Sequence, residues 1–396
     1  MCLPPTGLTI SAMAENTASS HPSRWITVLW STLLVTLLIL AGCASPSRSN
    51  LTPFPPMPND RPPGASPQAQ EVAKGLGRGV NFGNMLEAPI EGAWGLSVNR
   101  DLVDAVAKGG FNSVRVPVRW SNHALAERPF TLEPSFARRA ENVVDALLAK
   151  GLYVVLNVHH YRHLDGEPAD EGELSVSPEL ADERFLVLWQ QIAQRFKGRS
   201  DRLLFELYNE PHGRLDAARW NDLMARALGV VRASNPNRVV VVTPVNWGNA
   251  GDLKAMKLPN DPHLIASIHN YAPFKFTHQG ASWIKPALPT GVTCCDADQR
   301  AELIAPLDIA KAWSDQSGYP VYLGEFGAFN AADMASRVAY TRLMRQQALS
   351  RGISWTYWEM ASHFGVYDPV QRAYRQPLLD ALMGTDGPDK AEPPSP

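Results

Sequence analysis

The sequence predicts an α/β protein whose folded part is a single closed (β/α)8 barrel. Short apolar runs alternate with helical patterns throughout residues 71–385, which is typical of successive parallel βα units. Most of these runs are apolar at every position, as expected for parallel strands that are buried on both faces. Eight such runs are present, the number that closes a barrel of this type. An open doubly wound sheet is the alternative architecture for the same alternation.

The predicted strands are runs of β-branched, aliphatic and aromatic residues. They lie at residues 79–82, 113–118, 152–158, 203–210, 238–242, 264–268, 321–324 and 354–357. Between them apolar residues recur at helical spacing, as in Phe136, Ala140, Val143 and Leu147. Two further helices are expected near residues 299–317 and 331–349.

The first 42 residues resemble an export signal. Residues 25–42 are apolar and uncharged, follow Arg24, and end in small residues, the composition of a secretory signal. The run ends Leu40-Ala41-Gly42-Cys43, which resembles the lipobox of bacterial lipoproteins. That resemblance implies that Cys43 is lipidated and that the protein is exported and anchored to a bacterial membrane. An uncleaved membrane anchor and an ordinary secretory signal for a soluble protein are the alternatives.

The segments that flank the predicted barrel have a different composition. Residues 43–70 are rich in Pro and Ser, which favours an extended linker over a packed core. Residues 386–396 form a polar, Pro-containing tail. We therefore expect the folded domain to occupy residues 71–385.

Composition narrows the function. The formal net charge is −2 and no cluster of Lys and Arg stands out, so nucleic acid is not expected as a partner. Four cysteines, without a Cys-x-x-Cys pair, exclude a disulfide framework and a structural zinc site. We expect a monomer whose only membrane contact is the N-terminal anchor.

Polar residues gather where the predicted strands end. Such residues follow or lie within six of the strands: Arg115; His159, His160 and Tyr161; Asn209 and Glu210; His269 and Tyr271; Glu325; Trp358 and Glu359. Because the carboxyl ends of barrel strands converge on one mouth, these side chains are expected to share a pocket. Carboxylates on opposite sides of such a mouth suit glycoside hydrolysis.

Two other chemistries fit this set of residues less well. Adjacent residues of a strand point to opposite faces, so His159 and His160 cannot easily share a metal ion, and no His-Glu-x-x-His motif occurs. A Ser-His-Asp hydrolase needs a Gly-x-Ser-x-Gly elbow, which the sequence lacks. We expect neither a metal nor a cofactor.

The segments around these residues resemble glycoside hydrolase family five, the cellulase-type retaining (β/α)8 enzymes. The resemblance covers about residues 75–384 and is carried by residues 77–89, 157–161, 204–212, 269–280, 324–327 and 357–359. It implies an endo-β-1,4-glucanase that hydrolyses a β-linked polysaccharide by double displacement. A β-mannanase, an enzyme acting on both polymers, and a non-catalytic carbohydrate-binding lipoprotein are the alternatives.

The same resemblance implies a role for each residue. Glu210 would be the acid/base and Glu325 the nucleophile, about 5–5.5 Å apart as in retaining enzymes. Arg115, Asn209, His269 and Tyr271 would support them. Substrate contacts on the non-reducing side and at the cleavage point are implied for Asn84, Glu87, His159, His160 and Trp358.

Two features stay open. Trp94, Trp247 and Trp283 are either sugar platforms or packing residues. Of the three, Trp283 is the candidate for substrate binding. The adjacent Cys294 and Cys295 are either free thiols or a vicinal disulfide.

Overall fold

A computed structural model describes residues 64–385 of the chain. Eight parallel strands form a closed barrel in the order of the sequence, each strand pairing with its chain neighbours and the last with the first. The strands are β1 (Arg78–Asn81), β2 (Ser113–Val116), β3 (Tyr153–Asn157), β4 (Leu203–Glu206), β5 (Val240–Val242), β6 (Leu264–His269), β7 (Val321–Glu325) and β8 (Ser354–Tyr357). The predicted barrel is confirmed, and the open sheet is excluded.

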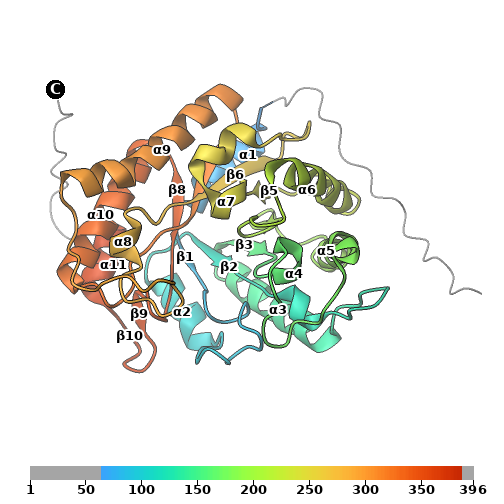
Figure 1. Cartoon of the computed structure of the whole chain (residues 1–396), viewed down its shortest axis with the longest axis horizontal. Coiled ribbons are helices and arrows are strands. Elements are labelled where there is room, and N and C mark those ends of the chain that lie inside the picture. Colours follow the sequence, from blue (N-terminus) through green and yellow to red (C-terminus); the bar gives the residue numbers. More distant parts are fainter. Residues whose placement is uncertain (1–63, 386–396) are drawn as a thin grey trace, which may run out of the picture. The chain divides into compact units, whose positions relative to one another are not determined.

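Helices surround the barrel (Figure 1). The longer ones are α2 (Arg100–Lys108), α3 (Pro134–Leu148), α5 (Pro178–Arg195), α6 (Ala217–Arg232), α9 (Ala297–Ser317), α10 (Met334–Ser350) and α11 (Gln376–Met383). Short helices α4 (Arg162–Asp165), α7 (Val245–Gly248) and α8 (Phe274–Thr277) follow strands β3, β5 and β6. A small hairpin, β9 (Tyr367–Asp368) with β10 (Ala373–Tyr374), precedes α11. The helices expected near residues 299–317 and 331–349 correspond to α9 and α10.

The folded domain begins earlier than predicted, with helix α1 (Pro67–Leu76). Ser66 caps this helix by accepting a hydrogen bond from the amide of Ala69, and Pro67 stands at its first position, where proline loses no helical bond. The linker expected to extend to residue 70 therefore ends before residue 67. A Pro/Ser-rich composition is shared by linkers and by the starts of capped helices, which explains the error.

Helix α1 belongs to the core of the barrel. Its buried residues, including Val72 and Leu76, share one cluster with side chains from β3, β4, β6 and β7 such as Val155 and Leu204. The neighbouring strand residues Val154 and Leu156 belong instead to the cluster that contains the surrounding helices. This alternation is the period-two pattern of a strand, and it explains why each strand is apolar throughout.

Within residues 64–385, no helix is long and apolar enough to cross a membrane. The predicted signal at residues 1–42, the lipidated Cys43, most of the linker and the tail at residues 386–396 lie outside the described residues. The two cysteines of the domain, Cys294 and Cys295, are joined in a disulfide. That bond decides between the two states that the sequence left open.

Candidate active site

The predicted catalytic residues meet at the carboxyl ends of the strands. Glu325 is the last residue of β7 and His269 the last of β6. Glu210 follows β4, whose ladder ends at Glu206 although main-chain bonds to neighbouring strands continue to Asn209. One oxygen of Glu210, one oxygen of Glu325 and one nitrogen of His269 all lie within 4.8 Å of one another. This proximity matches the spacing of retaining glycosidases, whereas inverting enzymes separate the carboxyl groups by about 6.5–9.5 Å.

Arg115 is the central support of the site. Its guanidinium is fully buried and donates to one oxygen of Glu325 at 2.7 Å and to Oδ1 of Asn209 at 2.6 Å. It also donates to both oxygens of Glu206, each at 2.7 Å, and to Oδ1 of Asn81 at 2.9 Å. Burial alone would lower the pKa of Arg115, but the charges of Glu206 and Glu325 hold it above its ordinary value. The arginine therefore stays charged and orients the predicted nucleophile.

Sequence reasoning missed Glu206 and Asn81. Glu206 is an acid inside the apolar run of β4 and is fully buried. A buried carboxylate needs a partner, so an acid at this position of the strand could have predicted an internal ion pair. Asn81 also donates to the carbonyls of Gly324 and Tyr357 at 3.0 and 3.3 Å. It thereby links β1 to the strands that carry the predicted nucleophile and Trp358.

The second oxygen of Glu325 has its own donor. The hydroxyl of Tyr271 donates to it at 2.8 Å. Burial raises the pKa of Tyr271 well above its usual range, so this hydroxyl keeps its proton and remains a donor. Burial also raises the pKa of Glu325, and the charge of Arg115 opposes this effect. Both oxygens of the predicted nucleophile are thus held by donors that favour its charged form.

Glu210 has fewer stabilising partners for its charge. Burial raises its pKa to about 7, and the positive charges of Arg115 and His212 offset only part of this effect. Its Oε1 lies 2.7 Å from Nδ1 of His269. Burial lowers the pKa of His269, so the ring is neutral. A carboxyl group with a pKa near neutrality can give up and take back a proton, as an acid/base must.

Three of the predicted sugar-binding residues contact one another through their rings. The rings of His159 and Trp358 stack at 5.9 Å, and His160 meets His159 edge-on at 4.3 Å. Asn84, in a left-handed conformation with φ 64°, donates to Ser362 Oγ at 3.0 Å. The three rings thus form one aromatic cluster, and Asn84 is held separately by the segment after β8.

Glu87 is placed differently from the expectation of a sugar contact. It is fully buried, and its carboxylate accepts the main-chain N–H groups of Asn84 and of Met85, the latter at 3.0 Å. Burial raises the pKa of Glu87 to about 7. In this structure Glu87 shapes the loop that presents Asn84, and its own carboxylate faces the protein interior.

The three tryptophans that the sequence left open are all exposed and lie around the site. Trp94 meets the ring of His160 at 6.1 Å, and Trp247 stacks on His212 at 4.7 Å. Trp283, which is 52% exposed, packs edge-on against Phe329 at 5.2 Å. Exposed aromatic faces beside a polar site suit pyranose rings.

Glu210, His269 and Glu325 also have the spacing of metal ligands within the described part of the chain. However, both oxygens of Glu325 already accept bonds from Arg115 and Tyr271. The guanidinium charge beside Glu325 also opposes a cation. The donor set therefore fits two-carboxylate chemistry better than metal binding.

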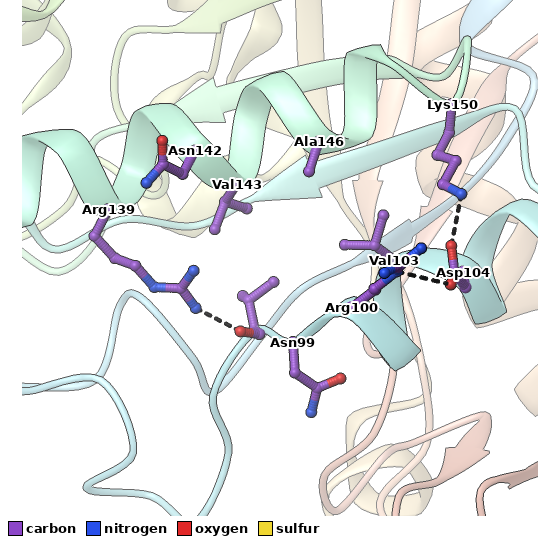
Figure 2. A pocket seen from close by; sticks show the side chains of 10 residues that line it. Asn99, Arg100, Val103, Asp104, Arg139, Asn142, Val143, Ala146 and Lys150 are labelled. Carbon is purple, nitrogen blue, oxygen red and sulfur yellow. Dashed lines mark hydrogen bonds and ion pairs between the residues drawn. The ribbon is translucent and has the colours of Figure 1, made fainter.

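A separate cavity of about 410 Å³ lies outside the barrel, between α2 and α3 (Figure 2). Polar side chains that include Arg100, Asp104, Arg139 and Lys150 line it together with apolar ones such as Val103. None of the predicted site residues lines it. The cavity is a surface feature that is distinct from the mouth of the barrel.

Known proteins share both the sequence and the fold. The model of the cellulase family (glycosyl hydrolase family 5) matches residues 77–364. Endoglucanase H of Acetivibrio thermocellus is 34% identical over 331 residues, which cover 81% of this chain and 35% of that protein. The chain thus spans about a third of the length of this relative.

Solved structures of Cel5A from Thermotoga maritima superpose with a TM-score of 0.75 and cover 79% of this chain and 99% of theirs. The structure described with cellobiose is 39% identical, and the one described with mannotriose is 38% identical. The family match covers most of the chain and includes both predicted catalytic carboxylates. The chain therefore belongs to the cellulase family, glycosyl hydrolase family 5.

Proposed function

We propose that this protein is a retaining endo-β-1,4-glucanase that hydrolyses β-1,4-glucan chains without a cofactor. The observation that carries the proposal is the pair Glu210 and Glu325, which are close in space but differ in environment. Arg115 and Tyr271 hold Glu325 by its two oxygens, whereas burial raises the pKa of Glu210 to about 7. One carboxyl group is prepared to attack and the other to donate a proton.

In the first step Glu325 attacks the anomeric carbon while Glu210 protonates the departing glycosidic oxygen. The bond between sugar and leaving group breaks as the bond between sugar and Glu325 forms. Asn209, fixed by Arg115 at 2.6 Å, binds the 2-hydroxyl, where a hydrogen bond strengthens as positive charge develops in the ring. The products are a covalent glycosyl-enzyme and a shortened chain with a new hydroxyl group.

In the second step Glu210, now ionised, takes a proton from water. The water oxygen attacks the anomeric carbon and releases Glu325, so the sugar retains its configuration. His269, at 2.7 Å from Glu210, holds the carboxyl group in position through both proton transfers. The cycle ends with Glu210 protonated again.

The names of the relatives favour glucan as the substrate. Endoglucanase H carries the activity in its name, and one Cel5A structure is described with cellobiose. A second candidate substrate is β-mannan, because another Cel5A structure is described with mannotriose. The two polymers differ in the orientation of the 2-hydroxyl, which is equatorial in glucan and axial in mannan. The side chain of Asn209 is proposed to bind this hydroxyl.

The test is release of reducing sugars from soluble β-glucan and from β-mannan by the full chain. Glu210→Gln and Glu325→Gln should each lower the rate on the preferred polymer by about a thousandfold or more while the protein stays folded. Wild-type protein that binds β-glucan without cleaving it would instead establish the carbohydrate-binding alternative. Mannan cleavage faster than glucan cleavage would reverse the substrate assignment.

We further propose that residues 1–42 direct export and that a lipid on Cys43 anchors a monomeric enzyme to a bacterial membrane. The Leu40-Ala41-Gly42-Cys43 sequence at the end of the apolar run supports this location. Mass spectrometry of the membrane fraction should find an acylated Cys43. Protein found in the culture medium without a lipid on Cys43 would instead favour the soluble secreted form.

A further inference from the structure

His212, two residues after the predicted acid/base, has a set of partners that the proposed mechanism does not use. Its Nδ1 donates to the main-chain carbonyl of Glu210 at 2.6 Å. Its ring stacks on Trp247 at 4.7 Å with an interplanar angle of 21°. Only 14% of the side chain is exposed. The ring is therefore packed between the acid/base loop and the segment that follows β5.

Two carboxylates from the segment after β3 face the same ring. Oδ1 of Asp165 lies 3.6 Å from Nδ1, and Oε1 of Glu167 lies 3.3 Å from Nε2. Asp165 is itself buried and held by the hydroxyl of Tyr208 at 2.5 Å, and its Oδ1 has no hydrogen-bond partner. Because a carbonyl oxygen only accepts, Nδ1 carries the proton of the bond to Glu210. Burial raises the pKa of Asp165 well above its usual range.

We propose that His212 is a positioning residue for the acid/base: packed between Trp247 and the carboxyl groups of Asp165 and Glu167, it fixes the main chain of Glu210 through its Nδ1–H group. The bond to the Glu210 carbonyl limits rotation of the peptide that carries the catalytic side chain. The charge of the ring also acts on the carboxyl group, since it lowers the pKa of Glu210. This inference rests on the proposed glycanase function and adds a residue to its machinery.

Other charged groups act on this arrangement. Arg162 pairs with the second oxygen of Glu167 at 3.2 Å. Arg214, on the same loop as His212, ties that loop to the segment after β3 through its amide, which donates to the carbonyl of Asp165 at 2.7 Å. Arg162 therefore balances part of the charge of Glu167. Arg214 acts on Asp165 only through its main chain, because its guanidinium pairs with Asp182 at 2.8 Å.

Two substitutions separate the parts of this role. His212→Phe keeps a ring against Trp247 but removes the N–H group and the charge. His212→Asn removes the ring and the charge but places an amide N–H near the position of Nδ1. His263→Phe is the matched control, because His263 precedes β6 at the opposite end of the barrel and bonds to Ser66. Glu167→Gln, at a half-exposed residue, removes one carboxylate charge with little risk to folding.

The readout compares kcat/KM on cellotetraose with kcat/KM on dinitrophenyl β-cellobioside, whose leaving group departs without protonation. His212→Phe should lose about tenfold to a hundredfold on cellotetraose, a part of what a general acid contributes, and less than about threefold on the activated glycoside. His212→Asn should lose less than His212→Phe on cellotetraose. Glu167→Gln should also lose more kcat/KM on cellotetraose than on the activated glycoside, and its loss on cellotetraose should be about twofold to threefold.

A pH profile gives a second readout. The alkaline limb of kcat/KM on cellotetraose should move to higher pH in His212→Phe, because the charge that lowers the pKa of Glu210 is gone. Equal losses on both substrates with an unchanged pH profile would show a packing role and overturn the proposal. Unchanged activity in folded His212→Phe would overturn it too. A wild-type enzyme that cleaves neither substrate would refute the proposed function and, with it, this inference.

Discussion

Two groups of charged side chains on this protein look alike in composition but differ in burial. At the barrel mouth, Arg115 pairs with Glu206 and Glu325, and the guanidinium and Glu206 are 0% exposed. In the outer cavity of Figure 2, Asp104 pairs with Lys150 at 2.6 Å and with Arg100 at 3.8 Å. There the side chain of Arg100 is 92% exposed.

The difference in burial decides what each group can do. Charges removed from water must recover several kcal/mol per ion through partners of good geometry, which explains why all the neighbours of Arg115 lie at 2.6–2.9 Å. An exposed pair gains little, since water and salt screen it. A buried network can hold a nucleophile in a fixed orientation, whereas the outer group leaves its side chains free to exchange partners with water.

The largest effect is expected when the centre of the buried group is removed. Arg115→Ala leaves Glu206 and Glu325 buried without their cation, which should cost about 3–5 kcal/mol of unfolding free energy and abolish activity. Urea unfolding followed by fluorescence measures the first quantity. Arg100→Ala is the matched control from the outer cavity, and its unfolding midpoint should equal that of the wild type. A similar shift in both variants would contradict the comparison.

A smaller effect is expected from Glu206→Gln. The amide keeps the shape of the side chain and one acceptor but removes one negative partner of the buried Arg115. This should lower the free energy of unfolding by about 2–3 kcal/mol. We expect kcat to fall with little change in KM, because Glu206 orients Arg115 and does not face the sugar. Kinetics on soluble β-glucan and urea unfolding test both parts. A raised KM at constant kcat would place Glu206 in substrate binding instead.

The pH profile should report the two carboxylates separately. The acid/base must be protonated, so kcat/KM should fall about tenfold per pH unit above about 7, the pKa to which burial raises Glu210. The nucleophile must be ionised, and burial raises its pKa, so the acid limb should lie above the ordinary range of a glutamate. In Glu210→Gln the alkaline limb should disappear, and its persistence would assign that limb to another group.

The smallest effect is expected in the outer cavity. A hydrogen bond from Lys150 lowers the pKa of Asp104, whose side chain is 29% exposed. Lys150→Met should change neither the pH profile nor kcat on β-glucan. At high salt its free energy of unfolding should equal that of the wild type. Loss of activity in this variant would show that the outer cavity communicates with the barrel mouth.

Sequence reasoning drew on local signals. The abrupt stop of an apolar run at Pro211 pointed to Glu210, and the polar residues that end β6 and β7 pointed to His269 and Glu325, which the structure brings together. It was less successful with Glu87, where nothing in the neighbouring residues distinguishes an acid that meets a ligand from one that caps its own loop. The early start of α1 was missed because its first residues share the composition of the linker.

By itself the sequence determined the alternation of strands and helices, and hence the barrel and the residues at its mouth. These features follow from periodicity and from residues that end strands, both of which act over a few neighbouring positions. Only the tertiary structure decided which charges meet. Arg115 finds Glu206 and Glu325 at distances of 91 and 210 residues along the chain, and His212 finds Asp165 across two loops. Pairings of this kind depend on how strands lie side by side in space, and no local pattern encodes them.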